Sequence, residues 1–251
     1  MIRFASLALL LLAWQAAALV ADPRRLPGPA PVFAAILDEA ASGALFVNLG
    51  VTLLRVAAAF VLAMSLGSAL GYLMGRRPAV DRLFDPWLVV LLNLPALVVI
   101  VLAYLWAGLT ETAAVGAVAL NKLPNAIVVA REGARALDKN LDEMAHVFRL
   151  GARTRLRHIV LPQLAPYIAA ATRSGLSLVW KIVLVVELLG RSNGVGFEIN
   201  MAFQLFDVRL LLAYAIPFVA LMLGLETFLV QPFERHVSRW RRGPARGPGL
   251  V

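Results

Sequence analysis

The sequence predicts an all-α integral membrane protein with about six transmembrane helices and a cytoplasmic loop between the fourth and the fifth. Of its 251 residues, 61% are apolar and 16% charged, and the mean hydropathy is +0.79. Ordinary soluble domains carry about 25% charged residues. The apolar residues also gather in runs of about 20, the length that a helix needs to cross a bilayer.

Six runs meet that length requirement. Each is apolar on consecutive residues and rich in Leu, Ala and Val, whereas the strands of a β-barrel would alternate. We therefore expect transmembrane helices at Ile2–Ala21, Leu45–Gly75, Pro86–Gly108, Thr112–Ala130, Tyr167–Leu189 and Val208–Val230.

The first run, within residues 1–21, has two interpretations. Arg3 followed by an apolar, Ala-rich stretch before Asp22 fits a cleaved signal peptide. The run exceeds the usual signal core, which favours a retained helix. Residues 22–44 then form a periplasmic connector, in which Pro23–Pro31 predicts a stiff extended segment. Residues 45–230 form the main transmembrane domain, and 231–251 form a basic cytoplasmic tail.

The distribution of positive charge predicts the orientation. Of 24 Lys and Arg residues, 16 fall on the side that holds the N-terminus, four fall on the opposite side and four lie inside the runs. Because cytoplasmic segments carry the excess of Lys and Arg, both termini are expected in the cytoplasm. The same bias explains the net charge of +9 without a nucleic-acid partner.

The sequence lacks the residue patterns that metal sites and several kinds of catalytic site require. The chain has no cysteine, and its three histidines are scattered, so no metal site is expected. No phosphate-binding G-x-x-x-x-G-K-[ST] motif, nucleophile elbow or zinc-type His-Glu helix is present. We therefore expect that the chain is not an enzyme and does not hydrolyse ATP itself.

The loop at 136–166 is basic and amphipathic. Asn140 followed by Glu143 predicts a helix start with a capping box. Gly151 permits a break in the helix, and Pro162 predicts its end. Apolar residues recur at helical spacing on one side, and arginines recur every four residues on another: Arg149, Arg153 and Arg157. Such a segment fits either the anionic surface of a membrane or a groove of a soluble partner.

The same loop resembles the EAA signature of ABC importer permeases. Glu143-Met144-Ala145 is followed, at the family's spacing, by Ile159-Val160-Leu161-Pro162. The likeness departs at Met144, where the family has Ala, and at Arg149, where it has Gly. Further matches resemble the permeases of the nitrate, sulfonate and taurine group: Leu54-Arg55-Val56, Pro95, Leu105-Trp106, Gly108, Pro166-Tyr167, Glu187-Leu188-Leu189-Gly190 and Gly194-Val195-Gly196.

The resemblance implies a set of partners and a docking loop. In that family the loop forms coupling helices that sit on a separate ATP-binding cassette subunit, which binds ATP and Mg, so this chain itself needs no cofactor. It further implies an external solute-binding protein, a second copy of the chain, and the bacterial inner membrane. By position, the docking loop would comprise Glu143, Ala145, Gly151, Ile159, Leu161 and Pro162.

Charged residues inside the apolar runs are functional candidates because they are costly in lipid. Lys122, Lys181 and Glu187 are assigned to the translocation pathway or to an intramembrane charge network. An anionic solute could pair with Lys122 or Lys181, or Lys122 could neutralise Glu187 inside the bundle. Arg55, Arg173 and Glu226 are the other charges, and the long side chains among them can reach the headgroups.

The function predicted from these observations is the permease subunit of an ATP-driven importer for a small anionic solute. It would work by alternating access. A gradient-driven transporter is the alternative, although no repeated pair of broken helices is visible. A membrane scaffold with a lipid-binding loop is a second alternative.

Overall fold

The structure is a computed structural model that describes residues 2–237. Every regular element in that range is helical, as the sequence predicts. Within the described residues, four helices are long and apolar enough to cross a membrane, and the number rises to five when one bent pair is counted as a span. The basic tail predicted at 231–251 begins as helix α12 (Gln231–Val237), and its remainder lies outside the described residues.

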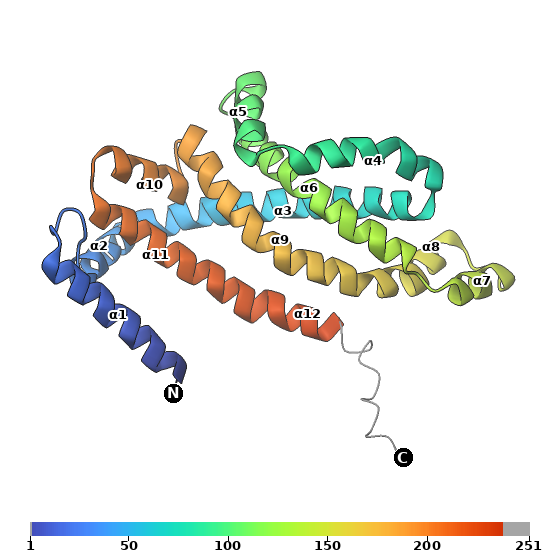
Figure 1. Cartoon of the computed structure of the whole chain (residues 1–251), viewed down its shortest axis with the longest axis horizontal. Coiled ribbons are helices and arrows are strands. Elements are labelled where there is room, and N and C mark those ends of the chain that lie inside the picture. Colours follow the sequence, from blue (N-terminus) through green and yellow to red (C-terminus); the bar gives the residue numbers. More distant parts are fainter. Residues whose placement is uncertain (1, 238–251) are drawn as a thin grey trace, which may run out of the picture.

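The spanning helices lie along the long axis of the molecule (Figure 1). They are α3 (Ala44–Arg76), α6 (Glu111–Arg135), α9 (Leu161–Gly190) and α11 (Val208–Leu225), the last continuing through a π turn, η2 (Glu226–Val230), into α12. At 33 residues, α3 is about 50 Å long. It therefore exceeds the roughly 30 Å of bilayer hydrocarbon and must project or tilt.

The third predicted span is not one straight helix. It consists of α4 (Pro78–Asn93) and α5 (Ala96–Ala107), which meet at a bend of 100°. Leu94 has the extended conformation that a residue before proline favours, and Pro95 has no N–H to continue the helix. The apolar run continues through this break, which is why hydropathy alone predicted a single span.

The N-terminal part begins with helix α1 (Ile2–Val20), which covers the first predicted run. The connector that follows it differs from the prediction. The Pro23–Pro31 connector is not extended, because it turns after Asp22 and enters helix α2 (Pro29–Ala41). Pro29 has the fixed φ that suits a first helical position, and Gly28 caps the helix in an extended conformation.

Small residues allow α3 and α6 to pack along most of their length. Three glycines at four-residue spacing on α3 face three alanines at the same spacing on α6: Gly67, Gly71 and Gly75 against Ala126, Ala130 and Ala134. A Cβ added at Gly71 would meet the carbonyl oxygen of Ile127. The two backbones therefore approach closely, as helices in lipid do when small residues line their contact.

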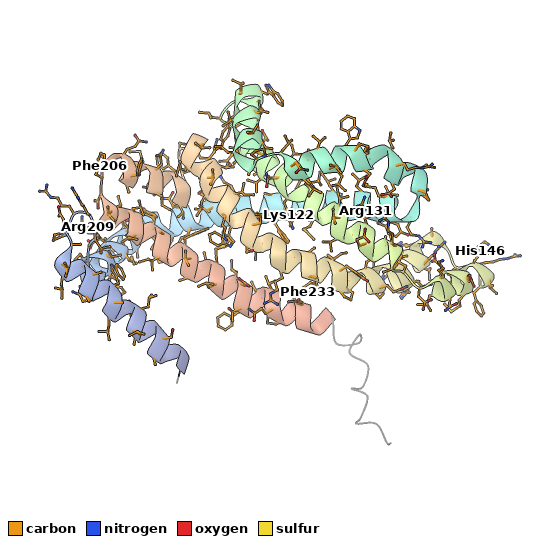
Figure 2. The ribbon with its side chains drawn as sticks, viewed as in Figure 1. Lys122, Arg131, His146, Phe206, Arg209 and Phe233 are labelled. Atoms are coloured by element: carbon orange, nitrogen blue, oxygen red, sulfur yellow. The ribbon has the colours of Figure 1, made fainter. Side chains whose placement is uncertain are left out.

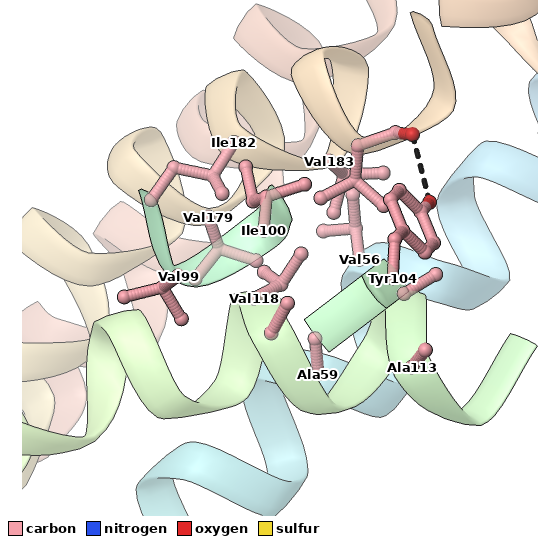
Figure 3. Close-up of a cluster of buried hydrophobic side chains, with 13 residues drawn as sticks. Val56, Ala59, Val99, Ile100, Tyr104, Ala113, Val118, Val179, Ile182 and Val183 are labelled. Carbon is pink, nitrogen blue, oxygen red and sulfur yellow. Dashed lines mark hydrogen bonds between the residues drawn. The ribbon is translucent and has the colours of Figure 1, made fainter. Parts of the chain in front are cut away.

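The main core joins α3, α5, α6 and α9 (Figure 3). Val56 from α3, Ile100 from α5, Val118 from α6 and Val183 from α9 are all buried there. The Tyr104 hydroxyl donates a 2.8 Å hydrogen bond to the Val186 carbonyl, which satisfies the only polar atom of its side chain. This core holds the outer part of α9 against α3 and α6.

Candidate functional site

The loop between α6 and α9 projects from one end of the molecule (Figure 1). It contains α7 (Lys139–Val147), the short α8 (Ala152–Arg155) and a π turn, η1 (Leu156–Val160). The predicted cap at Asn140 is wrong. The Asp138 carboxylate instead accepts the Asn140 N–H at 2.8 Å, so the helix begins two residues earlier and Glu143 makes no capping box.

The predicted break lies between Phe148 and Gly151. Arg149, with φ of 49°, adopts the left-handed conformation, whereas Gly151 caps α8 with φ of −60°. The three arginines predicted on one stripe are therefore distributed over a turn, α8 and η1 rather than one helix.

Pro162 does not end the helix as predicted. The helical backbone continues from α8 through η1 into α9, and the Leu161 N–H bonds the Leu156 carbonyl across a π turn. Prolines are one cause of irregular turns within helices, because their ring and missing N–H disturb the regular ladder. Pro232 follows η2 at the same spacing.

Asp142 anchors α7 to the rest of the molecule. Its carboxylate accepts hydrogen bonds from Arg76 at the end of α3 and, at 2.8 Å, from Arg155 on α8. Partial burial opposes ionisation, but the two guanidinium groups outweigh it, and the pKa of Asp142 lies below its ordinary value. This carboxylate therefore ties α7 to α3 and to α8, which continues through η1 into α9.

The six residues predicted to dock divide into two groups. Ala145 and Ile159 are buried against the molecule itself, whereas the other four are exposed: Glu143, Gly151, Leu161 and Pro162. Beside them α7 presents large apolar side chains to the outside, with Val147 76% and Phe148 71% exposed. Leu141 and Met144 are exposed on the same helix. The buried Ala145 holds α7 in place. Leu141, Met144, Val147 and Phe148 are therefore better candidates for contact with a partner than the two buried residues.

The predicted intramembrane charges lie apart from one another. Lys122, at the middle of α6 (Figure 2), is 2% exposed and lies against the backbone of α9 at Gly175. Among the described residues it takes part in none of the ion pairs. Lys181 is exposed and lies over the ring of Trp180 at 5.4 Å. Glu187 is fully buried.

Glu187 pairs with Arg55 rather than with Lys122. The distance from Arg55 Nη1 to Glu187 Oε1 is 2.7 Å. Arg55 also donates to Glu111 through Nε at 2.9 Å and to the Asn193 carbonyl. Thr52 and the Gly196 N–H donate to the second oxygen of Glu187 at 2.9 and 2.8 Å. The buried ion pair thus has the additional hydrogen bonds that such a pair needs.

This network fixes the Gly190–Gly196 loop between α9 and α10 (Val195–Gln204). Asn48 and Thr52 accept the backbone N–H groups of Gly194 and Val195, both at 2.8 Å. Gly194 has φ of 103°, and a Cβ there would meet Glu187 and Arg55. The Gly190–Gly196 loop is therefore held firmly to α3.

Sequence reasoning missed most of this network. Asn48, Thr52 and Arg55 recur at spacings of four and three within an apolar helix. That spacing places three polar side chains on one face, which is a signal of a buried polar contact. Nothing in the sequence identified Glu111, Asn193 or Asp142 as partners, because these contacts join segments far apart in the chain.

Apolar spanning helices with a helical loop projecting from one end define the class of multi-helix membrane proteins. The chain matches the family model described as "Binding-protein-dependent transport system inner membrane component" over residues 63–241. The chain belongs to this family and is a permease of the ABC importer type.

Individual proteins that resemble the chain are also named as transport permeases. The aliphatic sulfonates transport permease SsuC of Escherichia coli is 31% identical over 90% of this chain and 87% of its own length. SsuC of Bacillus subtilis is 30% identical over 86% of this chain and 78% of its own length. The taurine permease TauC of Escherichia coli is 25% identical over 94% and 88%.

Solved structures show the same fold. An inward-facing crystal form of the MetNI methionine ABC transporter matches with a TM-score of 0.62 at 16% identity, over 74% of this chain and 92% of that one. An amino acid ABC transporter crystallised with histidines matches with a TM-score of 0.63 at 20% identity, over 80% and 98%. The family match and the named relatives favour the importer over the gradient-driven transporter and the scaffold.

Proposed function

We propose that this chain is the membrane subunit through which an ATP-driven importer moves a small anionic solute of the sulfonate, taurine or nitrate kind. The names of the relatives support this class of solute. Lys122 supports it independently, because a buried ammonium group with no carboxylate beside it among the described residues can bind an anion. Lys181 is the second candidate cation for this role.

The energy comes from a separate ATP-binding cassette subunit that binds ATP and Mg and docks on the loop. The observation that carries this proposal is the exposed apolar face of α7, defined by Leu141, Met144, Val147 and Phe148. Asp142 would transmit the movement of that face to α3 through Arg76 and, through Arg155, to α8, which continues into α9. A lipid-facing segment has less need of two ion pairs that hold it in one orientation.

The other components of the importer are inferred from the same family. An external solute-binding protein delivers the solute at the end opposite to the loop, and a second copy of the chain encloses the path. The loop and both termini lie in the cytoplasm of a bacterial cell, surrounded by inner-membrane lipids. The excess of Lys and Arg on that side supports the orientation.

Co-purification with the ATP-binding subunit of the same system tests the docking. Wild type and Phe33→Ser should retain the subunit, because Phe33 is an exposed phenylalanine on α2, far from the loop. Phe148→Ser should lose most of it, and Glu143→Lys tests the exposed carboxylate beside it. Failure of the wild type to retain any ATPase would turn the assignment towards a gradient-driven transporter or a scaffold.

Uptake of radiolabelled taurine, an alkanesulfonate and nitrate tests the solute class. We expect Lys122→Met to lower uptake of the preferred anion at least tenfold at equal membrane levels. The same change should raise the thermal midpoint, because it removes a buried unpaired charge. Normal uptake by this variant would exclude Lys122 from the path.

A further inference from the structure

Arg149 is held in a backbone conformation that does not suit it. It follows α7 at the position where a helix ends in a Schellman motif. The Arg149 N–H bonds the His146 carbonyl at 3.0 Å, and the Leu150 N–H bonds the Ala145 carbonyl at 2.9 Å. That motif needs a positive φ, here 49°, which glycine adopts without steric cost and arginine does not.

Most of the described residues with a positive φ are glycines. Among the described residues, positive φ occurs at Gly43, Gly108 and Gly194, and at only two residues of other types, Arg149 and Phe206. A strained residue of this sort persists where its side chain has a role, and such positions cluster at functional sites.

The Arg149 side chain makes no polar contact with the rest of the described chain. The residue is exposed and takes part in none of the ion pairs or side-chain hydrogen bonds of the described chain. Asp142, a half-buried acid in the same loop, is already engaged by Arg76 and Arg155. The guanidinium group is thus free to pair outside the chain.

The surroundings of Arg149 indicate an acidic partner. It directly follows Val147 and Phe148, the most exposed part of the apolar face of α7. Arg153, Arg157 and His158 are exposed on the next turns, and His146 lies at the tip of the loop (Figure 2). An apolar centre with a cationic rim is the anatomy of a protein interface, and arginine is enriched in such interfaces.

We infer that Arg149 pairs with a carboxylate on the ATP-binding subunit and helps to select the matching subunit. This inference rests on the proposed docking of that subunit on α7. The strained backbone and the unpaired guanidinium group carry it together, since the conformation costs stability while the side chain makes no ion pair or hydrogen bond within the described chain. A matching ATPase subunit should present an acidic patch beside an apolar groove.

The test compares Arg149→Gly, Arg149→Lys and a charge control, Arg82→Gln, in binding to the purified ATP-binding subunit in detergent. Arg82 is exposed on α4 and bonds only the Pro78 carbonyl of its own helix. We expect the glycine variant to bind at least fivefold more weakly while its thermal midpoint is equal to or above that of wild type. The lysine variant should recover at least half of the lost affinity, and Arg82→Gln should match wild type.

The outcomes separate this inference from the proposed function. If wild type binds the ATPase and Arg149→Gly binds equally well, the pairing is overturned while the importer assignment stands. If wild type itself does not bind, both fall. A loss seen only in anionic nanodiscs, and not in detergent, would assign the guanidinium group to a lipid headgroup and would also overturn the inference.

Discussion

The charge of Glu187 is the residue-scale feature on which the outer part of the fold depends. The carboxylate accepts from Arg55, Thr52 and the Gly196 N–H while fully buried. Glu187→Gln keeps the shape but removes the charge and one acceptor oxygen. Hydrogen bonds to charged groups are worth roughly 1.5–3 kcal/mol, and we expect a loss of stability of about that size.

The unfolding midpoint in mild detergent measures this loss. Glu226→Gln is the matched control, since Glu226 lies in a spanning helix and takes part in none of the ion pairs of the described residues. An equal midpoint for Glu187→Gln and wild type would show that the ion pair contributes little to the folded state.

Glu198 on α10 gives a prediction of pH dependence. Burial raises its pKa, a hydrogen bond from Asn48 opposes the rise, and the nearby charge of Glu39 adds to it. Because the folded state then binds the proton more tightly than the unfolded state, stability falls as pH rises from about 4.5 through the raised pKa. Glu198→Gln should remove this decline and raise the thermal midpoint at pH 7.5.

Thermal scans at several pH values would check this prediction. The variant keeps an oxygen that can accept the 3.0 Å hydrogen bond from Asn48, so loss of that contact does not confuse the result. The two proteins should converge near pH 4. A wild-type midpoint that rises steadily from pH 5 to pH 7.5 relative to the variant would contradict the sign argued above.

The packing of α3 on α6 is the feature to test at the scale of the element. Gly71 lies so close to α6 that an added Cβ would meet the Ile127 carbonyl and Ala130. Backbone cannot move aside as a side chain can, so Gly71→Ala should destabilise the pair by about 1–3 kcal/mol. Gly50→Ala, on the same helix with nothing within 4 Å, should be neutral or slightly stabilising.

Denaturant-induced unfolding of the two alanine variants would measure the difference. Both changes add the same methyl group to the same helix, so helix propensity cancels between them. If Gly71→Ala proved as stable as Gly50→Ala, the glycine-alanine contact would not determine how closely the helices approach.

How far the sequence predicts an element depends on whether its cause is local. Apolar runs of sufficient length predict α3, α6, α9 and α11, because crossing lipid is a property of the segment itself. The bend at Pro95 was missed because hydropathy does not register backbone geometry. The Asp138 cap was missed because the capping-box pattern at Asn140 competed with it.

The candidate sites depend on contacts between distant segments, and these were harder to predict. Ala145 and Ile159 were expected to dock, yet they pack inward, because periodicity gives the faces of a helix without saying which one meets the protein. The partner of Glu187 was expected on α6 and lies on α3. The spacing of Asn48, Thr52 and Arg55 is the one local signal that pointed to it.

Two polar clusters hold loops against the long helices. Figure 1 shows the two loops concerned, α7 and the turn between α9 and α10, well apart along the molecule. In one cluster Asp142 joins α7 to α3 and α8, and in the other Arg55 and Glu187 join the α9–α10 loop to α3. Helix α3 takes part in both, and α8 continues through η1 into α9, which carries Glu187. A movement imposed on α7 would therefore reach the outer loop through two continuous helical paths, as alternating access requires.

The orientation of this arrangement can be tested because the chain has no cysteine of its own. Gly151→Cys adds a thiol to the α7–α8 turn, where nothing lies within 4 Å of the new Cβ, and Ser192→Cys adds one to the exposed loop at the opposite end. In cells whose outer membrane is permeabilised and whose inner membrane is intact, a membrane-impermeant maleimide should label Ser192→Cys and should not label Gly151→Cys. A permeant maleimide should label both. Labelling of Gly151→Cys from outside would reverse the orientation, and it would place the α7 face beyond the reach of any ATP-binding subunit in the cytoplasm.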